Sequence, residues 1–379
     1  MRLFISAGEP SGDLHGANLI HSLRRQDPNL DIVGFGGARM AAAGCRHLYP
    51  LCDLAVMGVS QVLANAPVFL EQISNADRYF RHHRPDAVVM IDYPGFHWWL
   101  ARRAKFHRIP VFWFVPPQLW GWASWRVGKM RRNVDHVLCS LPFEKEWYRQ
   151  RGVTAHYVGH PYFDEMPHQQ LDAEFVTAQR AQPGPVVALL PGSRNQEIER
   201  NLPTLVRAAT AVHAARPDVR FLAACYKEKQ RKHVAEYLAR HPLPIEAHVG
   251  RTPEIIHLAE ACAAVSGSVS LELLWHGTPS VIVYRVKPLL LRMRPYLLNC
   301  RFITLVNLLA DRELFPEFVT DRCPAAGVSE QLLHWLNDAE ARASARQELL
   351  ELREQVAEPG ACERAARFVL DALVKRAAA

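Results

Sequence analysis

The sequence predicts two α/β domains, each built on a parallel β-sheet. Three observations support this fold class: a repeated domain start, the alternation of strands with helices, and the length of the chain. An apolar run that breaks into a glycine-containing turn and opens a helix occurs at 3–14 and again at 186–198. A chain of 379 residues is too long for one ordinary core and suits two cores of about 150–200 residues each. We therefore expect two such domains, with a nucleotide-type ligand at the helix starts.

The elements can be placed in order along the chain. In the first half, short apolar runs bounded by turn residues predict strands at 2–7, 31–35, 87–92, 110–115, 134–139 and 155–158. In the second half, the same signals predict strands at 186–190, 219–224, 245–249, 262–265 and 280–284. Helical patterns fill the gaps between them. This alternation is typical of parallel sheets joined by right-handed crossovers.

The domain boundary is placed after Val158-Gly159-His160-Pro161, where polar residues and the Pro- and Gly-rich break at 182–185 precede the second domain start. The predicted domains are 1–165 and 166–325. The remaining stretch, 326–379, has a helical pattern rich in Ala, Glu and Arg. We expect its helices to pack at the domain junction.

The composition is that of a globular protein. Hydrophobic residues make up 49% of the chain and charged residues 22%, and no apolar run approaches the ~20 residues of a membrane span. The N-terminus reads as a strand rather than as a signal peptide, which predicts a cytoplasmic location. The eight cysteines are scattered without zinc-binding spacing, so they read as small buried hydrophobic residues. The net charge of +7 favours anionic ligands and anionic membrane surfaces.

Two turns in the second half are candidates for a nucleotide site. Ser266, Gly267 and Ser268 follow an apolar strand and open a helix, whose free N–H groups suit a phosphate. Glu272 lies inside that helix, where a carboxylate can accept hydrogen bonds from both hydroxyls of a ribose. The alternative is that Ser268 caps the helix and Glu272 is a first-turn acid favoured by the helix dipole. This motif alone does not separate the two.

The other turn, Gly192-Ser193-Arg194, favours the nucleotide interpretation, because a guanidinium at the same edge of the sheet can neutralise a diphosphate. Further nucleotide signatures are missing. Gly34–Gly37 matches a dinucleotide fingerprint only loosely, and the chain has no GxxxxGK[ST] loop. A short Asp-x-Asp motif is absent too. We therefore expect no metal ion and no cofactor, with helix ends and Arg194 stabilising the phosphate charge.

A set of short motifs runs in order across nearly the whole chain. Its segments include 6–13, 36–37, 57–58, 115–117, 141–144, 158–161, 190–194, 266–267, 271–272, 284–285 and 307–309. The set resembles the lipid-A-disaccharide synthase family (glycosyltransferase family 19). The resemblance implies a GT-B glycosyltransferase, with an N-terminal acceptor-binding domain and a C-terminal UDP-sugar-binding domain facing across a cleft, and no metal requirement.

The resemblance also implies the reaction and further site residues. UDP-2,3-diacylglucosamine would donate 2,3-diacylglucosamine to 2,3-diacylglucosamine 1-phosphate, forming a β-1,6-linked disaccharide 1-phosphate and UDP with inversion. On the acceptor side, the implied loop residues are Glu9, Ser11, Gly12, Met57 and Gly58. On the donor side, the resemblance adds Asn307 and Glu313. Spacing alone favours a simpler interpretation of that last segment, a capped helix with an ordinary ion pair.

One position departs from the family pattern. The family carries a sequence close to Asp-x-Pro-Asp-Phe-Asn after the third expected strand, and its second Asp is a candidate general base. This chain reads Asp92-Tyr93-Pro94-Gly95-Phe96-His97, so Gly95 stands where that carboxylate would be. A glycine cannot accept the proton. Two alternatives to the family activity follow: a UDP-sugar transferase with a changed acceptor, or a catalytically impaired UDP-sugar or lipid-binding homologue.

Other groups must therefore be considered for the proton transfer. The candidates are Asp13, then Asp92, then His97, with His15 beside the first glycine turn. Imidazole is neutral and basic near pH 7, and a catalytic role for His97 predicts a rate that falls as pH drops through about 6–7. The alternative is that His97, which precedes two tryptophans, is simply packed or exposed.

Acylated substrates predict peripheral contact with the inner membrane through an apolar surface flanked by Lys or Arg. Three segments fit: 62–70, 98–105 and 287–294. The alternative for the first two is a buried helix face. A homo-oligomer is compatible with the sequence, whereas nothing in it suggests nucleic-acid binding.

Overall fold

A computed structural model describes residues 1–55, 66–241, 243–286, 288, 291–293 and 299–378. The chain forms two compact units. The first comprises Met1–Pro167 together with Glu358–Ala379, and the second comprises His168–Ala357. Met57, Gly58 and parts of the expected membrane segments 62–70 and 287–294 lie outside the described residues.

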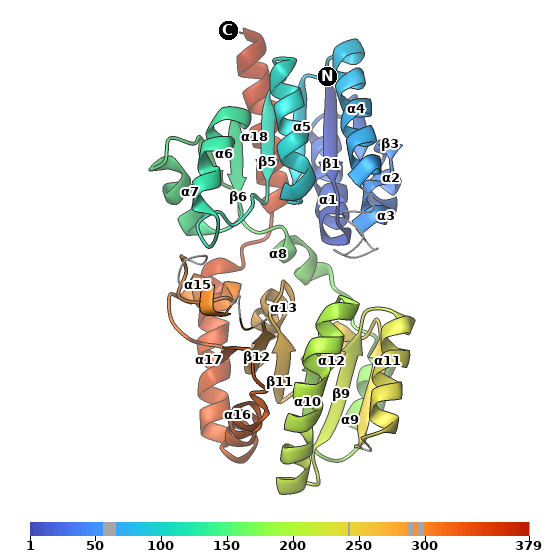
Figure 1. Ribbon diagram of the computed structural model, residues 1–379, viewed down its shortest axis with the longest axis vertical. Coiled ribbons are helices and arrows are strands. Elements are labelled where there is room, and N and C mark those ends of the chain that lie inside the picture. Colours follow the sequence, from blue (N-terminus) through green and yellow to red (C-terminus); the bar gives the residue numbers. More distant parts are fainter. Residues whose placement is uncertain (56–65, 242, 287, 289–290, 294–298, 379) are drawn as a thin grey trace. The chain divides into compact units, whose positions relative to one another are not determined.

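The first unit is built on a seven-stranded sheet in the order β3-β2-β1-β4-β5-β6-β7 (Figure 1). All of its neighbouring strands are parallel. The strands are β1 (Arg2–Ala7), β2 (Asp31–Phe35), β3 (Arg46–Tyr49), β4 (Ala87–Ile91), β5 (Val111–Phe114), β6 (His136–Cys139) and β7 (Ala155–Tyr157). The apolar residues of β1 and β4 are almost completely buried, as a central parallel strand requires.

Helices cover both faces of this sheet. They are α1 (Pro10–Gln26), α2 (Ala38–Ala42), α3 (Leu51–Ala55), α4 (Ala66–His83), α5 (Pro94–Phe106), η2 (Ser124–Arg126), α6 (Val127–Asn133), α7 (Pro142–Arg149), α8 (Tyr162–Glu165), η3 (Met166–His168) and α18 (Ala361–Ala378). Residues of α1, α2 and α18 form the core on one face. Residues of α4, α5 and α6 form the core on the other.

The last helix, α18, is tied to the first unit by a carboxylate. Asp164 accepts hydrogen bonds from the backbone amides of Gly360 (2.7 Å), Ala361 (2.9 Å) and Cys362 (2.8 Å), the first residues at the start of α18. Such contacts satisfy amides that a helix start leaves without partners. Further along α18, Arg364 donates to the carbonyl oxygen of Val158 at 2.8 Å. A segment far away in the sequence thus completes the first core.

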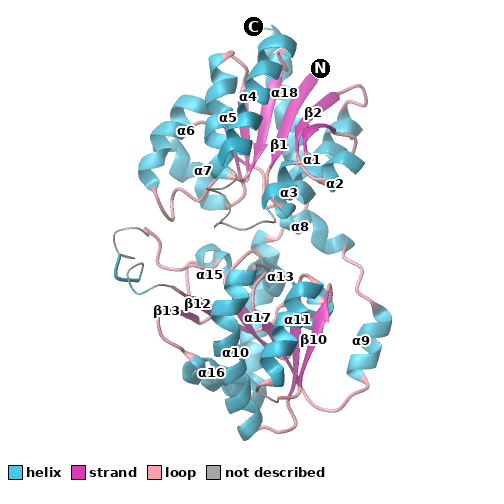
Figure 2. Ribbon diagram, turned by 45° about the vertical axis from the view of Figure 1, so that its right-hand side comes forward, coloured by secondary structure: helices cyan, strands magenta, loops and turns pink. Residues whose placement is uncertain are grey.

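The second unit contains a six-stranded parallel sheet in the order β10-β9-β8-β11-β12-β13 (Figure 2). Its strands are β8 (Val186–Leu190), β9 (Arg220–Cys225), β10 (Ile245–Val249), β11 (Ala261–Val265), β12 (Ser280–Arg285) and β13 (Glu317–Thr320). Its helices include α9 (Ala173–Arg180), α10 (Asn195–Ala215), α11 (Glu228–Ala239), α12 (Thr252–Leu258), α13 (Val269–His276), α15 (Leu305–Ala310), α16 (Ala325–Asn337) and α17 (Ala339–Val356).

The two parallel sheets confirm the predicted fold class, and every expected strand is present within two residues of its expected limits. Two strands were not expected, β3 and β13. Both are outermost strands with partly exposed, polar sequences, so they lack the apolar signal of a buried strand. The stretch 326–379 is not one segment: α16 and α17 belong to the second unit, and α18 belongs to the first. Among the described residues, no helix is both long enough and apolar enough to cross a membrane.

Candidate functional site

In the first unit, the turn after β1 is closely packed against the turn after β4. A Cβ atom added to Gly8 would lie 2.0 Å from the Tyr93 ring, so only glycine allows the ring to cover the backbone there. Burial, followed by the nearby Glu9 carboxylate, raises the pKa of the Tyr93 hydroxyl to about 12. Ser11 and Gly12 follow in the first turn of α1, where Ser11 is exposed and Gly12 is buried. The described acceptor-side residues thus lie at the carboxyl edge of the first sheet.

Asp13 holds the start of a neighbouring helix. Its Oδ1 accepts from the amides of Gly37 (2.8 Å) and Met40 (3.0 Å), and its Oδ2 accepts from the amide of Arg39 (3.0 Å). A side chain at Gly37 would collide with this carboxylate, because its Cβ would lie 2.6 Å from Oδ2. The carboxylate is buried and directed at backbone amides, which favours a structural role over proton transfer.

Asp92 sits in an unusual backbone conformation at the carboxyl end of β4. Asp92 and Tyr93 have φ values of 48° and 50°, in the left-handed region that residues other than glycine seldom occupy. The carbonyl oxygen of Asp92 accepts from His97 Nδ1 at 2.6 Å and from Trp113 Nε1 at 3.2 Å. Such conformations persist where the surroundings hold them and concentrate at functional sites. The Asp92 side chain is half-buried.

His97 is completely buried between those partners. With Nδ1 donating to Asp92, Nε2 accepts from the Ser6 hydroxyl at 2.9 Å. Burial lowers the pKa of His97 to about 4, against a smaller opposite effect of the hydrogen bond to Asp92. Both nitrogens are engaged and the ring is neutral near pH 7. This geometry favours the packed interpretation over a general base that titrates at pH 6–7.

Gly95 occupies open space in the first turn of α5. It is exposed, and an added Cβ would meet no other atom within 4 Å. Its φ is outside the left-handed region, so other residues are sterically allowed there. The fold therefore has room for the carboxylate that the sequence lacks.

In the second unit, the two glycine-containing turns leave the same edge of the sheet. β8 and β11 are hydrogen-bonded neighbours, and Leu190 is level with Ala264 near their carboxyl ends. Gly192 has a φ of 114°, and its Cβ would lie 2.7 Å from that of Glu197. Parallel strands that end side by side bring the helix starts after them together, which is a common arrangement for phosphate ligands.

Arg194 lies at the start of α10 on this edge. Its Nη1 is 3.1 Å from Glu197 Oε1, and its side chain is 62% exposed. Glu197 Oε2 also accepts from the amides of Ser193 (3.1 Å) and Arg194 (3.2 Å). An exposed ion pair of this kind contributes little to stability. The pair with Glu197 therefore adds little to the stability of the fold.

At the neighbouring turn, Gly267 and Ser268 are exposed and Ser266 is half-buried. Ser268 precedes α13 without capping it through its side chain, contrary to one half of the simpler interpretation, whereas Glu272 is a first-turn acid of α13, as the other half expected. The hydroxyl of Ser270 instead donates to the carbonyl oxygen of Gly267 at 2.9 Å. Glu272 is 5% exposed, and its Oε1 accepts from Gln169 Nε2 at 3.1 Å. Glu272 is thus a buried, hydrogen-bonded acceptor in the first turn of α13.

Asn307 is engaged by the protein itself. Its Nδ2 donates to Phe315 O (2.7 Å) and Glu317 Oε1 (2.9 Å), and its Oδ1 accepts from the amides of Leu314 and Phe315, both at 2.8 Å. The side chain is completely buried. These contacts fix the chain between α15 and β13, so Asn307 shapes this segment rather than offering a free amide.

The simpler interpretation of this segment fits the described contacts. Thr304 caps α15, and Arg312 pairs with Glu348. Glu313 is exposed, and its Oε1 accepts from the Glu317 amide at 3.4 Å. Sequence reasoning missed Glu317, whose carboxylate also accepts from the amides of Ile303 and Thr304.

In the first unit, the buried carboxylate of Glu144 was not among the expected site residues. Glu144 accepts from the indole Nε1 of Trp120 (2.9 Å) and from the amides of Ser140 and Leu141 (both 3.0 Å). Burial raises its pKa to about 7, although these hydrogen bonds favour the charged form. A signal was available, since an acid at the third position of a helix that begins with Pro142 is a known capping pattern.

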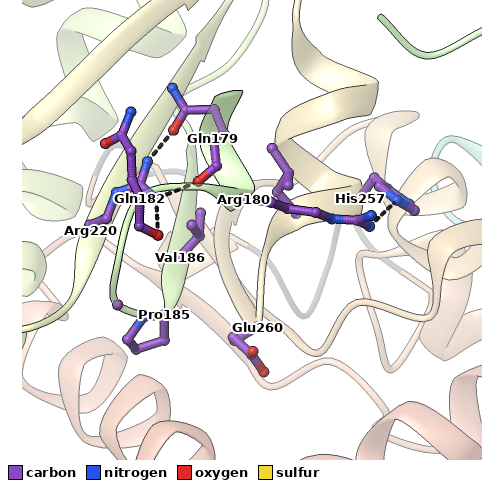
Figure 3. A pocket seen from close by; sticks show the side chains of 10 residues that line it. Gln179, Arg180, Gln182, Pro185, Val186, Arg220, His257 and Glu260 are labelled. Carbon is purple, nitrogen blue, oxygen red and sulfur yellow. Dashed lines mark hydrogen bonds between the residues drawn. The ribbon is translucent and has the colours of Figure 1, made fainter. Parts of the chain in front are cut away.

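A cavity of about 250 Å³ lies elsewhere in the second unit (Figure 3). Its walls include Val186 at the start of β8, Arg220 at the start of β9, and Glu260 just before β11. It therefore lies at the amino edge of the sheet, opposite the two turns. The donor candidates do not line it. In the described residues, no group of three or more His, Cys, Asp or Glu side chains is arranged to hold a metal ion.

Solved structures with the same architecture support the GT-B-type fold. The S. aureus MnaA-UDP co-structure has a TM-score of 0.67 at 12% identity and covers 97% of this chain and 95% of its own. A putative UDP-N-acetylglucosamine 2-epimerase from Listeria monocytogenes has a TM-score of 0.66 at 11% identity, covering 98% and 94%. At such identities the likeness concerns the fold alone.

Proteins related in sequence identify the family more specifically than the structural comparison does. Lipid-A-disaccharide synthase from Myxococcus xanthus is 35% identical over 381 residues, covering 98% of this chain and 97% of the relative. The synthase from Geobacter metallireducens is 33% identical over 376 residues, covering 99% and 98%. A model of the family described as Lipid-A-disaccharide synthetase (LpxB) matches residues 3–372. The chain therefore belongs to the lipid-A-disaccharide synthetase family of glycosyltransferases.

Proposed function

We propose that the protein transfers 2,3-diacylglucosamine from UDP-2,3-diacylglucosamine to 2,3-diacylglucosamine 1-phosphate. The products are the β-1,6-linked disaccharide 1-phosphate and UDP. The observation that carries this proposal is the family match over residues 3–372, which includes the turns at both sheet edges. Acylated substrates also imply peripheral contact with the inner membrane.

The second unit supplies the donor contacts in this proposal. Arg194 and the amides at the starts of α10 and α13 stabilise the diphosphate, and Glu272 accepts hydrogen bonds from the ribose hydroxyls. As the bond between the sugar C1 and the diphosphate oxygen breaks, negative charge develops on UDP. Preorganised N–H donors and a guanidinium stabilise that charge in the transition state. Ser266, Gly267 and Gly192 allow the backbone to approach the phosphates.

Asp92 is the base in this proposal. Its carboxylate takes the proton from the acceptor's 6-hydroxyl, whose oxygen attacks C1 from the face opposite UDP and inverts the configuration. Asp92 is preferred to Asp13, because the Asp13 carboxylate already accepts from three amides. It is preferred to His97, because that ring is buried with its pKa lowered to about 4. The hydrogen bonds from His97 and Trp113 to its carbonyl oxygen hold the Asp92 backbone at the end of β4.

The test combines purified protein, both acylated sugars and a mild detergent, with UDP release and product mass as readouts. We expect disaccharide 1-phosphate and UDP in equal amounts, and UDP release that requires the acceptor. Absence of product at high protein concentration would contradict the proposal.

A second candidate function is favoured by Gly95: a UDP-sugar transferase with another acceptor. The same UDP assay separates the two. Turnover with other acylated sugars but not with 2,3-diacylglucosamine 1-phosphate would establish the changed acceptor. Binding of UDP without turnover toward any acceptor would instead indicate an impaired homologue.

A further inference from the structure

The segment between Asp92 and Asp135 is unusually basic and aromatic. It contains eight Lys or Arg residues and no Asp or Glu. Six of the nine tryptophans of the chain lie between Trp98 and Trp125. Trp113 and Trp120 are buried in the core, whereas Trp99, Trp122 and Trp125 are exposed.

On α5, two exposed aromatic side chains flank two arginines. Trp99, Arg102, Arg103 and Phe106 have the i, i+3, i+4, i+7 spacing of one helix face. Trp99 is 56% exposed and Phe106 is 75% exposed, although an outward helix face is ordinarily polar. The expected segment 98–105 is thus divided, since Leu100 is buried in the core while Trp99 points outward.

The neighbouring turn η2 and helix α6 repeat this pattern. Trp125 is 68% exposed, and Lys129 and Arg132 follow it at i+4 and i+7. Trp122 is 46% exposed, with the Arg126 guanidinium 4.8 Å from its ring centroid. Helices α5 and α6 pack against each other and cover the same face of the first sheet (Figure 2). We call their outward side the α5–α6 face.

The charges of the α5–α6 face are only partly neutralised within the protein. Arg103 lies 4.0 Å from Asp77, and Lys105 lies 2.6 Å from Asp135. Within the described parts of the chain, Arg102, Lys129 and Arg132 form no ion pair with an acidic residue. The face is therefore positive as well as aromatic.

We propose that the α5–α6 face docks on a lipid surface rich in anionic headgroups. Tryptophan and phenylalanine suit the boundary between headgroups and acyl chains, and exposed cations are attracted to anionic headgroups. The absence of any acid between Asp92 and Asp135 removes the repulsion that such a surface would exert. This inference rests on the proposed function, because it assigns the surface through which a protein with acylated substrates reaches them.

The test measures sedimentation of the full chain with vesicles of phosphatidylcholine, with and without phosphatidylglycerol. We expect binding to the anionic vesicles, weaker binding to neutral ones, and weaker binding at high salt. Replacing Arg102, Lys129 and Arg132 by Ser should lower the anionic-vesicle affinity by on the order of 100-fold, because each of the three cations contributes about fivefold. Replacing Trp99, Phe106 and Trp125 by Ser should also weaken binding to both kinds of vesicle.

The matched control changes Tyr226→Ser and Lys232→Ser on the second unit, where Tyr226 is as exposed as Trp99. The control should bind vesicles as the parent does. Equal binding by the aromatic variant and the parent, or loss of binding in the control, would overturn the assignment. A competition experiment with duplex DNA is a further check. If the DNA displaced the vesicles and bound through the same residues, the assignment of a lipid partner would be overturned. Turnover with detergent-dispersed substrates is measured in parallel, so a failure of the proposed function is seen separately from a failure of docking.

Discussion

His97 donates a hydrogen bond of 2.6 Å from Nδ1 to the carbonyl oxygen of Asp92, five residues earlier in the chain. The bond closes the turn between β4 and α5, and the Trp113 indole shares the same acceptor. His97 and Asp92 were both candidate bases in the sequence, but their side chains have different surroundings in the structure. The buried ring holds the backbone, whereas the Asp92 side chain is only half-buried.

Asp92→Asn should lower turnover by about 10²–10⁴ while leaving UDP affinity unchanged, because the amide keeps the size of the carboxylate and loses its basicity. Steady-state kinetics and UDP calorimetry provide the two measurements. A variant with nearly normal turnover would remove Asp92 from the reaction.

Asp13→Asn serves as the contrasting variant. An amide group would face one of the three backbone N–H donors, so we expect the free energy of unfolding to fall by about 1–3 kcal/mol. Turnover per folded molecule should stay within severalfold of the parent. Urea denaturation followed by kinetics checks both, and a large loss of turnover in a stable variant would return Asp13 to the list of bases.

Gly95→Asp should restore activity to the Asp92→Asn variant. The new side chain meets open space, and a carboxylate in the first turn of α5 is favoured by the helix dipole. We expect the double variant to exceed Asp92→Asn by at least about tenfold, since a positioned base contributes about 10²–10⁴. Gly95→Asn in the same background is the control and should give no recovery. No gain from Asp over Asn would show that a base cannot act from this position.

Arg194→Ala and Glu272→Ala should each weaken UDP binding. Charge-assisted hydrogen bonds contribute about 1.5–3 kcal/mol, which corresponds to about 10- to 100-fold in Kd. Arg231→Ala is the matched control, because Arg231 forms a similar exposed pair three residues from Glu228 on α11. Calorimetry with unchanged affinity in both folded variants, or equal weakening in the control, would refute the donor placement.

The free energy of unfolding should decrease as pH falls from about 6.5 to about 4. The folded state keeps His97 neutral, with its pKa lowered to about 4, whereas an unfolded histidine titrates near 6.5. The unfolded state therefore binds more protons in this window, and His97 contributes up to about 3 kcal/mol that is complete above pH 6.5. Urea denaturation across this range should show a shallower decrease for His97→Gln. An identical pH dependence in both proteins would contradict the buried, neutral ring.

The sequence predicted the central strands and both domain starts because buried parallel strands are continuous apolar runs. β3 and β13 escaped detection because edge strands such as Glu317–Thr320 carry polar residues. The site was predicted less completely for a different reason. Sequence patterns identify carboxylates and amides, but not the partners that occupy them, so Asp13 and Asn307 looked available although backbone groups engage both. The left-handed backbone at Asp92 could not be predicted, because the residues that adopt it, Asp92 and Tyr93, are not glycines.

The capture of α18 by Asp164 has a consequence for how the protein is made. The core on one face of the first sheet includes Cys362, Ala365, Ala366, Val369 and Leu373, which leave the ribosome only after the second unit. The first unit therefore cannot complete its core until the whole second unit has been translated. Until then, the apolar face of the first sheet that α18 covers stays exposed to solvent. A stop codon just before α18 would leave the second unit whole but would remove part of the first. The lost helix is held by Asp164, which lies 196 residues before Gly360 in the sequence.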